Sequence, residues 1–246
     1  IRFGGLKAVS NFNMTINHGE LLGLIGPNGA GKTTIFNLLT GVYTPTEGQI
    51  IFLGEKISGL PPFKVTRKGI SRTFQNIRLF KELSVLDNVK IAYHPLATHN
   101  IFSSILRLAS HFTNEREMEE KAIEFLKIFG LDHLKDEKAK NLPYGGQRRL
   151  EIARALAADP KLLLLDEPAA GMNPQETKEL MELIAFIRKK FNLTILLIEH
   201  DMKLVMGICE RILVLDHGQL IAHGSPEEIR KHPKVIEAYL GEEVGE

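Results

Sequence analysis

A glycine-rich segment that reads "GPNGAGKTT", from Gly26 to Thr34, has the residue types that bind nucleotide phosphates. It matches the pattern G-x-x-x-x-G-K-[ST], with a predicted strand before it and a predicted helix after it. The loop's backbone N–H groups and the positive end of the helix attract an anion. We expect Lys32 to reach the β- and γ-phosphates of ATP and the Thr33 hydroxyl to ligate Mg²⁺. The predicted phosphate-binding residues are Asn28, Gly29, Ala30, Gly31, Lys32, Thr33 and Thr34.

Two carboxylates end the apolar run "KLLLLDEP", from Lys161 to Pro168. The run predicts a buried parallel strand, and ligands bind such sheets at the carboxyl ends of the strands. We therefore expect Asp166 near Mg²⁺ and Glu167 facing the γ-phosphate, where a carboxylate can orient and deprotonate the attacking water. The alternative is that both residues only cap the next element.

Two further polar side chains follow predicted strands. His200 ends the run "TILLIEH", and we expect it to contact the γ-phosphate, although a lone histidine is more often a surface residue or one with satisfied hydrogen bonds. Gln75 follows a predicted strand over Gly69–Phe74 and could hold the attacking water or ligate Mg²⁺, or it could be an ordinary loop residue. The predicted catalytic residues are Glu167, His200 and Gln75, and the predicted metal ligands are Thr33, Gln75 and Asp166.

A second glycine pair stands in "NLPYGGQRRLEIARAL", which runs from Asn141 to Leu156. Gly145, Gly146 and Gln147 start a basic amphipathic helix, so they make a second anion site. One nucleotide needs only one phosphate loop. We therefore expect the second site to face a partner's nucleotide, with two chains sandwiching two ATP molecules head to tail.

The bulk composition limits the function classes. The chain has 246 residues, 43% of them hydrophobic and 25% charged, with a net charge of +1, which argues against a nucleic-acid partner. Cys209 is the single cysteine, so no internal disulfide can form, as in proteins of reducing compartments. Apolar runs are far shorter than the roughly 20 residues of a membrane helix. Because Ile1 is not a start methionine and lies close to the first motif, we expect a few residues to precede it.

Short apolar runs alternate with helical periods, which predicts an α/β fold: a P-loop nucleotide-binding core with a mixed sheet and an antiparallel portion. A helical subdomain is inserted in this core. We expect the core over 1–78 and 160–231, the helical subdomain over 79–159 and a short C-terminal helical extension over 232–246. The predicted strands are Leu21–Ile25, Gln49–Leu53, Gly69–Phe74, Leu162–Leu165, Thr194–Ile198 and Arg211–Leu215.

Local signals also place helices and turns. A helix is predicted over Lys32–Leu39, and another from Asn114, whose Glu three residues later favours a helix start, to a stop at Gly130. Residues Asp216–Gln219 predict a hairpin turn, and Ser225 begins a capping box.

Five elements together, in their order and over essentially the whole chain, resemble the nucleotide-binding subunit of an ATP-binding cassette (ABC) transporter: Gly26–Thr34, Gln75, Gly145–Gln147, Leu162–Glu167 and His200. The resemblance implies a RecA-like core and makes Gly145–Gln147 the signature motif, which completes the opposite subunit's ATP site. It also implies that Gln75 begins a loop linking ATP to the membrane subunit. Phe3 matches the aromatic residue that stacks on adenine, although a core or chain-end residue would look the same.

The sequence departs from the family pattern at three positions. The signature usually reads Leu-Ser-Gly-Gly-Gln, and here Pro143 takes the Ser position and Tyr144 that of the first Gly. Because proline has no hydroxyl for the γ-phosphate, we expect the contact to come from the backbone N–H groups of Gly145 and Gly146. Asn173 stands where the family often has Asp, so it keeps hydrogen bonding but lacks the charge.

Four stretches are similar to the ATPases of branched-chain amino acid importers: "YGGQRRLEIARAL", "LDEPAAGMNP", the insert around His94–Phe112 and the ending "GSPEEIRKHPKVIEAYLGE". Such systems use two different ATPases, two membrane subunits and a substrate-binding protein. The resemblance therefore implies an ATPase at the cytoplasmic face of the membrane. Its partners would be permease subunits, a second ATPase subunit in a homo- or heterodimer and, indirectly, a substrate-binding protein.

Other functions stay open on the sequence alone. The chain could serve a transporter of urea, lipid or another amino acid, or act as a soluble cassette in translation or DNA repair. It could also be a regulator that binds nucleotide without hydrolysis, although Glu167 and His200 argue against this. An apolar helical stripe could dock on the membrane subunits or pack on the chain's own helical insert; its residues are Ile101, Phe102, Ile105, Leu106, Ala109 and Phe112.

Overall fold

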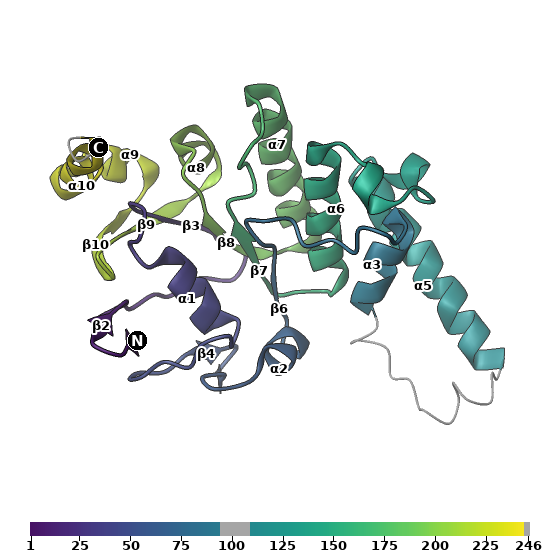
Figure 1. Cartoon of the computed structure of the whole chain (residues 1–246), viewed down its shortest axis with the longest axis horizontal. Helices are drawn as coiled ribbons and strands as arrows, with labels where there is room; N and C mark the ends of the chain where they lie inside the picture. The colour runs from purple at the N-terminus through teal and green to yellow at the C-terminus, as the bar shows by residue number, and fades with distance from the viewer. Residues whose placement is uncertain (94–108, 244–246) are drawn as a thin grey trace. The chain divides into compact units, whose positions relative to one another are not determined.

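The structure is a computed structural model that describes residues 1–93 and 109–243 of the chain. It divides into two compact units (Figure 1). The first unit combines Ile1–Gln75 with Lys161–Glu246, and the second unit is Asn76–Pro160. Within the described residues, no helix combines the length and the apolar character that crossing a membrane requires.

The first unit is built on a six-stranded sheet in the order β10-β9-β3-β8-β7-β6. Every neighbouring pair is parallel except β9 and β10, which form an antiparallel hairpin, so the predicted mixed sheet is confirmed. The strands are β3 (Leu21–Ile25), β6 (Ile70–Arg72), β7 (Leu162–Asp166), β8 (Thr194–Ile198), β9 (Arg211–Asp216) and β10 (Gln219–Gly224). Three of the four inner strands, β3, β7 and β8, are buried at every position, as expected for parallel strands covered on both faces.

Helices cover both faces of this sheet. Figure 1 shows α1 (Lys32–Leu39) on one side and α7 (Pro174–Phe191) and α8 (Met202–Ile208) on the other. Ile35 and Phe36 of α1 belong to a buried cluster with side chains from five strands. On the opposite face, a Cβ added to Gly23 would lie 3.0 Å from the Sγ of Cys209, so α8 packs closely against the sheet there.

Smaller elements surround the sheet. They are the two-stranded sheets β1 (Arg2–Phe3) with β2 (Leu6–Lys7) and β4 (Ile51–Phe52) with β5 (Glu55–Lys56), and the helices α2 (Pro62–Arg67), α9 (Pro226–Arg230) and α10 (Pro233–Glu243). The predicted strand over Gln49–Leu53 is shorter, because Leu53 takes a left-handed φ of 49° and begins the turn to β5. The capping box at Ser225 is confirmed at the start of α9.

The β9–β10 hairpin turn touches two other segments. Its residues His217 and Gly218 both have positive φ, at 42° and 74°. The N–H of Gly218 donates to the carbonyl of Ala30 at 2.9 Å, and its carbonyl accepts from the N–H of Ser10 at 2.8 Å. A Cβ on Gly218 would lie 2.5 Å from the carbonyl oxygen of Ala8. The turn therefore ties the N-terminal segment to the phosphate loop, and only glycine fits there without a shift.

The second unit is helical, as predicted. Its elements are α3 (Val85–Tyr93), α5 (Ala109–Ile128), α6 (Tyr144–Ala157) and the 3₁₀ turns η1 (Asp132–Leu134) and η2 (Ala139–Asn141). The predicted helix start at Asn114 is wrong, since α5 (Ala109–Ile128) already includes residues 109–113; Asn and Glu three residues apart also occur inside helices. Gly130 follows the helix end with a φ of 66°. The predicted stripe over 101–112 lies outside the residues whose side chains the structure describes.

Candidate active site

The predicted phosphate loop connects β3 to α1 and depends on glycine at two close approaches. A Cβ on Gly26 would lie 1.9 Å from the carbonyl oxygen of Leu215, and one on Gly31 would lie 2.9 Å from that of Ala8. Gly31 is the N-cap of α1 and gives it no side-chain cap, so the first N–H groups of the helix can bind an anion. Asn28, Gly29 and Thr33 are exposed, whereas Ala30 is buried and Thr34 half-buried.

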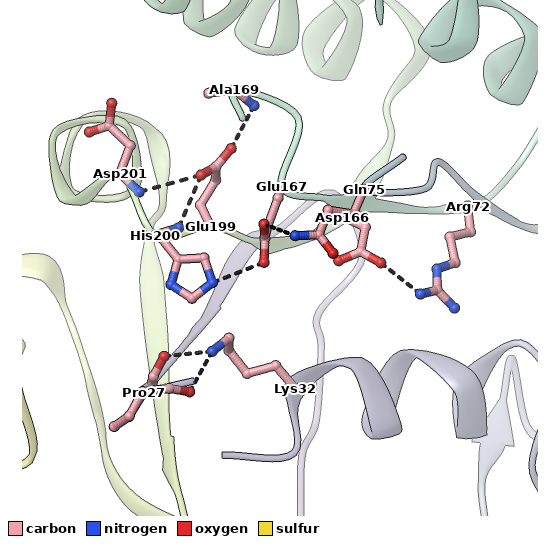
Figure 2. A network of polar contacts seen from close by, with 11 residues as sticks. Pro27, Lys32, Arg72, Gln75, Asp166, Glu167, Ala169, Glu199, His200 and Asp201 are labelled. Atoms are coloured by element: carbon pink, nitrogen blue, oxygen red, sulfur yellow. Dashed lines mark hydrogen bonds and ion pairs between the residues drawn. The ribbon is translucent and has the colours of Figure 1, made fainter. Parts of the chain in front are cut away.

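Lys32 folds back over the phosphate loop (Figure 2). Its side chain is buried, and Nζ donates to the carbonyl oxygens of Gly26 at 2.6 Å and Pro27 at 2.7 Å. These bonds hold the ammonium group at the loop. The positive charge therefore stands beside the N–H groups that are predicted to bind phosphate.

The three predicted catalytic side chains meet at the carboxyl edge of the sheet. Glu167 directly follows β7; its Oε2 accepts from the Nε2 of Gln75 at 2.6 Å, and its Oε1 lies 2.9 Å from the Nε2 of His200 (Figure 2). Glu167 takes a left-handed φ of 47°, which is uncommon outside glycine, while its N–H still bonds to Ile198 of the neighbouring strand. The structure thus brings together residues 92 and 33 positions apart in the chain.

Asp166, the last residue of β7, is 3% exposed and is held by a residue that sequence reasoning missed. The Nη2 of Arg72 donates to its Oδ2 at 2.6 Å, and Nη1 donates to the Oδ1 of Asn37 at 2.7 Å. The Arg72 guanidinium lies over the rings of Phe36 and Phe74, at 5.3 and 5.1 Å from their centroids. An arginine inside a predicted core strand was the available signal, because a buried charge requires a partner.

A second missed residue is Glu199, which is 3% exposed and lies between β8 and His200. Its carboxylate accepts from the backbone N–H groups of Ala169 at 2.7 Å, His200 at 3.0 Å and Asp201 at 3.4 Å (Figure 2). Burial raises the pKa of the Glu199 carboxyl more than these three hydrogen bonds lower it, and the charge of Glu167 adds to the rise in pKa.

The predicted adenine contact, Phe3, lies at the end of β1 and is 44% exposed. Its ring packs edge-to-face on Tyr43, with the centroids 5.1 Å apart. This contact fixes one edge of the Phe3 ring. Stacking on adenine stays a prediction.

The predicted second anion site belongs to the second unit, where α6 begins one residue earlier than expected. Its N-cap is Pro143 and Tyr144 is the first helical residue, so Gly145, Gly146 and Gln147 lie inside the first turn. The Nε2 of Gln147 donates back to the carbonyl of Leu142 at 2.8 Å. The helix has no side-chain N-cap bond, which suits an anion at its N–H groups.

Two of the residues that depart from the family pattern, Tyr144 and Asn173, have hydrogen-bond partners within the chain. The hydroxyl of Tyr144 accepts from the Nη2 of Arg148 at 3.1 Å, and Arg148 is fully buried against Glu151 at 2.9 Å. Asn173 is the N-cap of α7: its Oδ1 accepts from the N–H groups of Gln175 and Glu176, and the Glu176 carboxylate accepts from the N–H of Asn173. These contacts form a complete capping box.

Comparison with known proteins agrees with this geometry. The sequence model of the family described as "ABC transporter" matches residues 9–170. The solved structure of MJ1267 in its ADP conformation, an ATP-binding cassette of an ABC transporter, superposes with a TM-score of 0.83 at 32% identity, covering 97% of this chain and 94% of that one. The chain therefore belongs to the ABC transporter family, as an α/β cassette of the nucleotide-binding, ATP-hydrolysing subunits. The predicted resemblance and fold class are confirmed.

Within the family, the chain falls among the ATP-binding proteins of branched-chain amino acid transport. A model described as "Branched-chain amino acid ATP-binding cassette transporter" matches residues 219–245. Over 242 residues, the chain is 52% identical to the high-affinity branched-chain amino acid transport ATP-binding protein LivG of Escherichia coli (strain K12) and 50% identical to BraF of Pseudomonas aeruginosa. Both alignments cover 98% of this chain and 95% of the relative.

Proposed function

We propose that this chain hydrolyses Mg²⁺-ATP to energise the import of branched-chain amino acids through a membrane transporter. The observation that carries the hydrolytic part is the contact of Glu167 with both His200 and Gln75, at 2.9 and 2.6 Å. The substrate class is supported by the C-terminal family match and by the similarity to LivG and BraF.

The nucleotide contacts follow from the phosphate loop. Phe3 would stack on adenine, and the N–H groups of residues 28–34 would hold the phosphates, with Lys32 neutralising their charge. Thr33 and Asp166 would hold Mg²⁺, with Gln75 as a further ligand. These residues fit the ion because hydroxyl, amide and carboxylate oxygens are its preferred ligand types. When bound, Mg²⁺ would neutralise charge on the β- and γ-phosphate oxygens.

The chemical step uses the side chains around Glu167. A water held between Glu167 and Gln75 would attack the γ-phosphorus in line, and the bond to the ADP oxygen would break. The Glu167 carboxylate would accept the water proton. His200 would orient Glu167 through its 2.9 Å contact and donate to the γ-phosphate.

The assembly follows from the second anion site. In a pair of cassettes, the N–H groups of Gly145 and Gly146 of each chain would complete the opposite chain's ATP site. The second cassette would be another copy or a paralogue. Closing and opening of this pair would move the permease subunits at the cytoplasmic face of the membrane, to which a substrate-binding protein would deliver the amino acid.

The test is Mg²⁺-dependent ATP hydrolysis by wild type, Glu167→Gln and a control, Glu47→Gln, whose side chain is 80% exposed. We expect Glu167→Gln to bind ATP with a Kd within about twofold of wild type, since ground-state contacts persist. Its kcat should fall by about 10²- to 10⁴-fold, which is the usual contribution of a general base. Wild-type activity should rise more than linearly with protein concentration.

Normal turnover by Glu167→Gln would refute the base assignment. The transported solute needs a separate measurement, in vesicles that hold the cassette with its permease subunits. Uptake of leucine, isoleucine and valine that requires ATP inside and an active Glu167 would support the substrate class. Uptake restricted to another solute, such as urea or a lipid, would refute it.

A further inference from the structure

Glu199 is the one fully buried carboxylate at the carboxyl edge of the sheet that the proposed mechanism leaves unused, among the residues that the structure describes. Its two oxygens serve different loops. Oε1 accepts from the N–H of Ala169, in the loop after β7, at 2.7 Å. Oε2 accepts from the N–H groups of His200 at 3.0 Å and Asp201 at 3.4 Å, in the loop after β8 (Figure 2).

These two loops carry the two central side chains of the proposed reaction. Ala169 stands two residues after Glu167 and lies in a tight turn, in which the N–H of Ala170 donates to the carbonyl of Glu167 at 3.2 Å. His200 follows Glu199 directly, and Asp201 caps α8 by accepting from the N–H groups of Lys203 and Leu204. One rigid planar carboxylate therefore links the turn of Glu167 to the start of α8.

Burying a carboxylate costs free energy, because the group loses its hydration and needs hydrogen bonds from the protein in its place. Here the bonds come from backbone N–H groups of both loops, so the Glu199 side chain connects the two backbones directly. The contact between Glu167 and His200 spans the same two loops at 2.9 Å. A misplacement of about 1 Å between reacting groups can cost about 10²-fold in rate.

We propose that Glu199 is a positioning residue for ATP hydrolysis, which holds the loops after β7 and β8 at the separation that the Glu167–His200 contact requires. The inference rests on the proposed catalytic roles of Glu167 and His200. Glu199 itself touches neither water nor nucleotide in this scheme. It acts through the other two side chains.

The decisive variant is Glu199→Gln, which keeps the shape of the side chain but has a single acceptor oxygen. Its NH₂ group cannot accept from an N–H, so one of the two loop connections must be lost. We expect kcat to fall by about 10-fold to 10²-fold, because the lost connection would displace Glu167 relative to His200 by up to about 1 Å. The Kd for ATP should stay within about twofold, because the phosphate loop is unchanged.

A matched control is Glu20→Gln, which alters another buried carboxylate of the first unit. Glu20 precedes β3 at the opposite edge of the sheet, where it accepts from Arg211 at 2.7 Å. Glu20→Gln should lower the unfolding temperature but leave kcat within about twofold. If Glu199→Gln behaves in the same way, Glu199 has only a structural role and the proposal is wrong.

A double-mutant cycle separates positioning from an independent effect on rate. In the His200→Ala background the contact is already absent, so Glu199→Gln should slow hydrolysis by less than about twofold more. Full multiplication of the two losses would overturn the proposal. If Glu199→Gln does not fold, Glu199→Asp provides the same test, because it is one methylene too short to reach both loops. Normal turnover by Glu167→Gln would instead refute the proposed role of Glu167 as the base, independently of the Glu199 result.

Discussion

Removing the Arg72 guanidinium should leave a buried negative charge without its ion-pair partner. The side chains of Arg72 and Asp166 are only 8% and 5% exposed, and they meet at 2.6 Å. Removal of one partner from a buried pair typically costs about 3–5 kcal/mol. For a chain of this size, 1 kcal/mol corresponds to roughly 2–4 °C, so Arg72→Met should lower Tm by about 6–20 °C.

The assay is thermal unfolding followed by circular dichroism at neutral pH, without nucleotide or metal, so that only the chain's own contacts contribute. Arg72→Lys keeps the charge but not the planar guanidinium group that reaches both Asn37 and Asp166. Its Tm should therefore lie between those of wild type and Arg72→Met. Arg2→Met is the control, since the Arg2–Glu47 pair is exposed and 3.5 Å long. Its loss should cost about 0–1 kcal/mol.

Two results would refute this reasoning. The first is an Arg72→Met protein that unfolds within about 2 °C of wild type, because 3 kcal/mol cannot produce so small a shift. The second comes from the double variant Arg72→Met/Asp166→Asn, in which the unpaired charge is gone. If it is no more stable than Arg72→Met, the cost does not arise from the buried carboxylate.

Three further predictions concern packing and titration. Leu164→Ala removes a fully buried side chain of β7 and should cost about 2–5 kcal/mol in urea unfolding; a cost under 1 kcal/mol would contradict the packing. Gly218→Ala should destabilise the fold more than Gly54→Ala, since both have positive φ but only the former places a Cβ against the Ala8 carbonyl; equal unfolding midpoints would be inconsistent with this. Burial raises the pKa of Cys209 to about 12, so its thiol stays protonated and should resist iodoacetamide at pH 8 until urea unfolds the chain; fast labelling of the native protein would contradict its burial.

The sequence predicted the side chains that end apolar strands, because a single geometric rule covers them. Parallel strands bring their carboxyl ends to one edge, so Glu167 and His200 had to meet once β7 and β8 were neighbours. Gln75 was predicted in the same way from the strand before it. The approximate strand positions followed from the apolar runs, and the ends shifted where backbone conformation intervened, as at Leu53.

The supporting residues could not be predicted in the same way. Arg72 pairs with Asp166 because β6 lies beside β7, and hydrophobic periodicity does not specify strand order. Glu199 has a similar dependence, since its partner Ala169 belongs to a turn whose path is set by the φ of Glu167. The pattern of residue types can indicate that a charged side chain is buried. Its partners are identified only by the packed fold.

Asn173 holds the start of α7 without carrying a charge. Its side chain and its N–H are both used by the capping box of α7. Asparagine and aspartate cap helices about equally well, so an exchange between them leaves the helix intact. A single mutation can thus add or remove a charge without a cost in folding. An exchange at this position would therefore change the charge that the loop presents while the start of α7 stays in place.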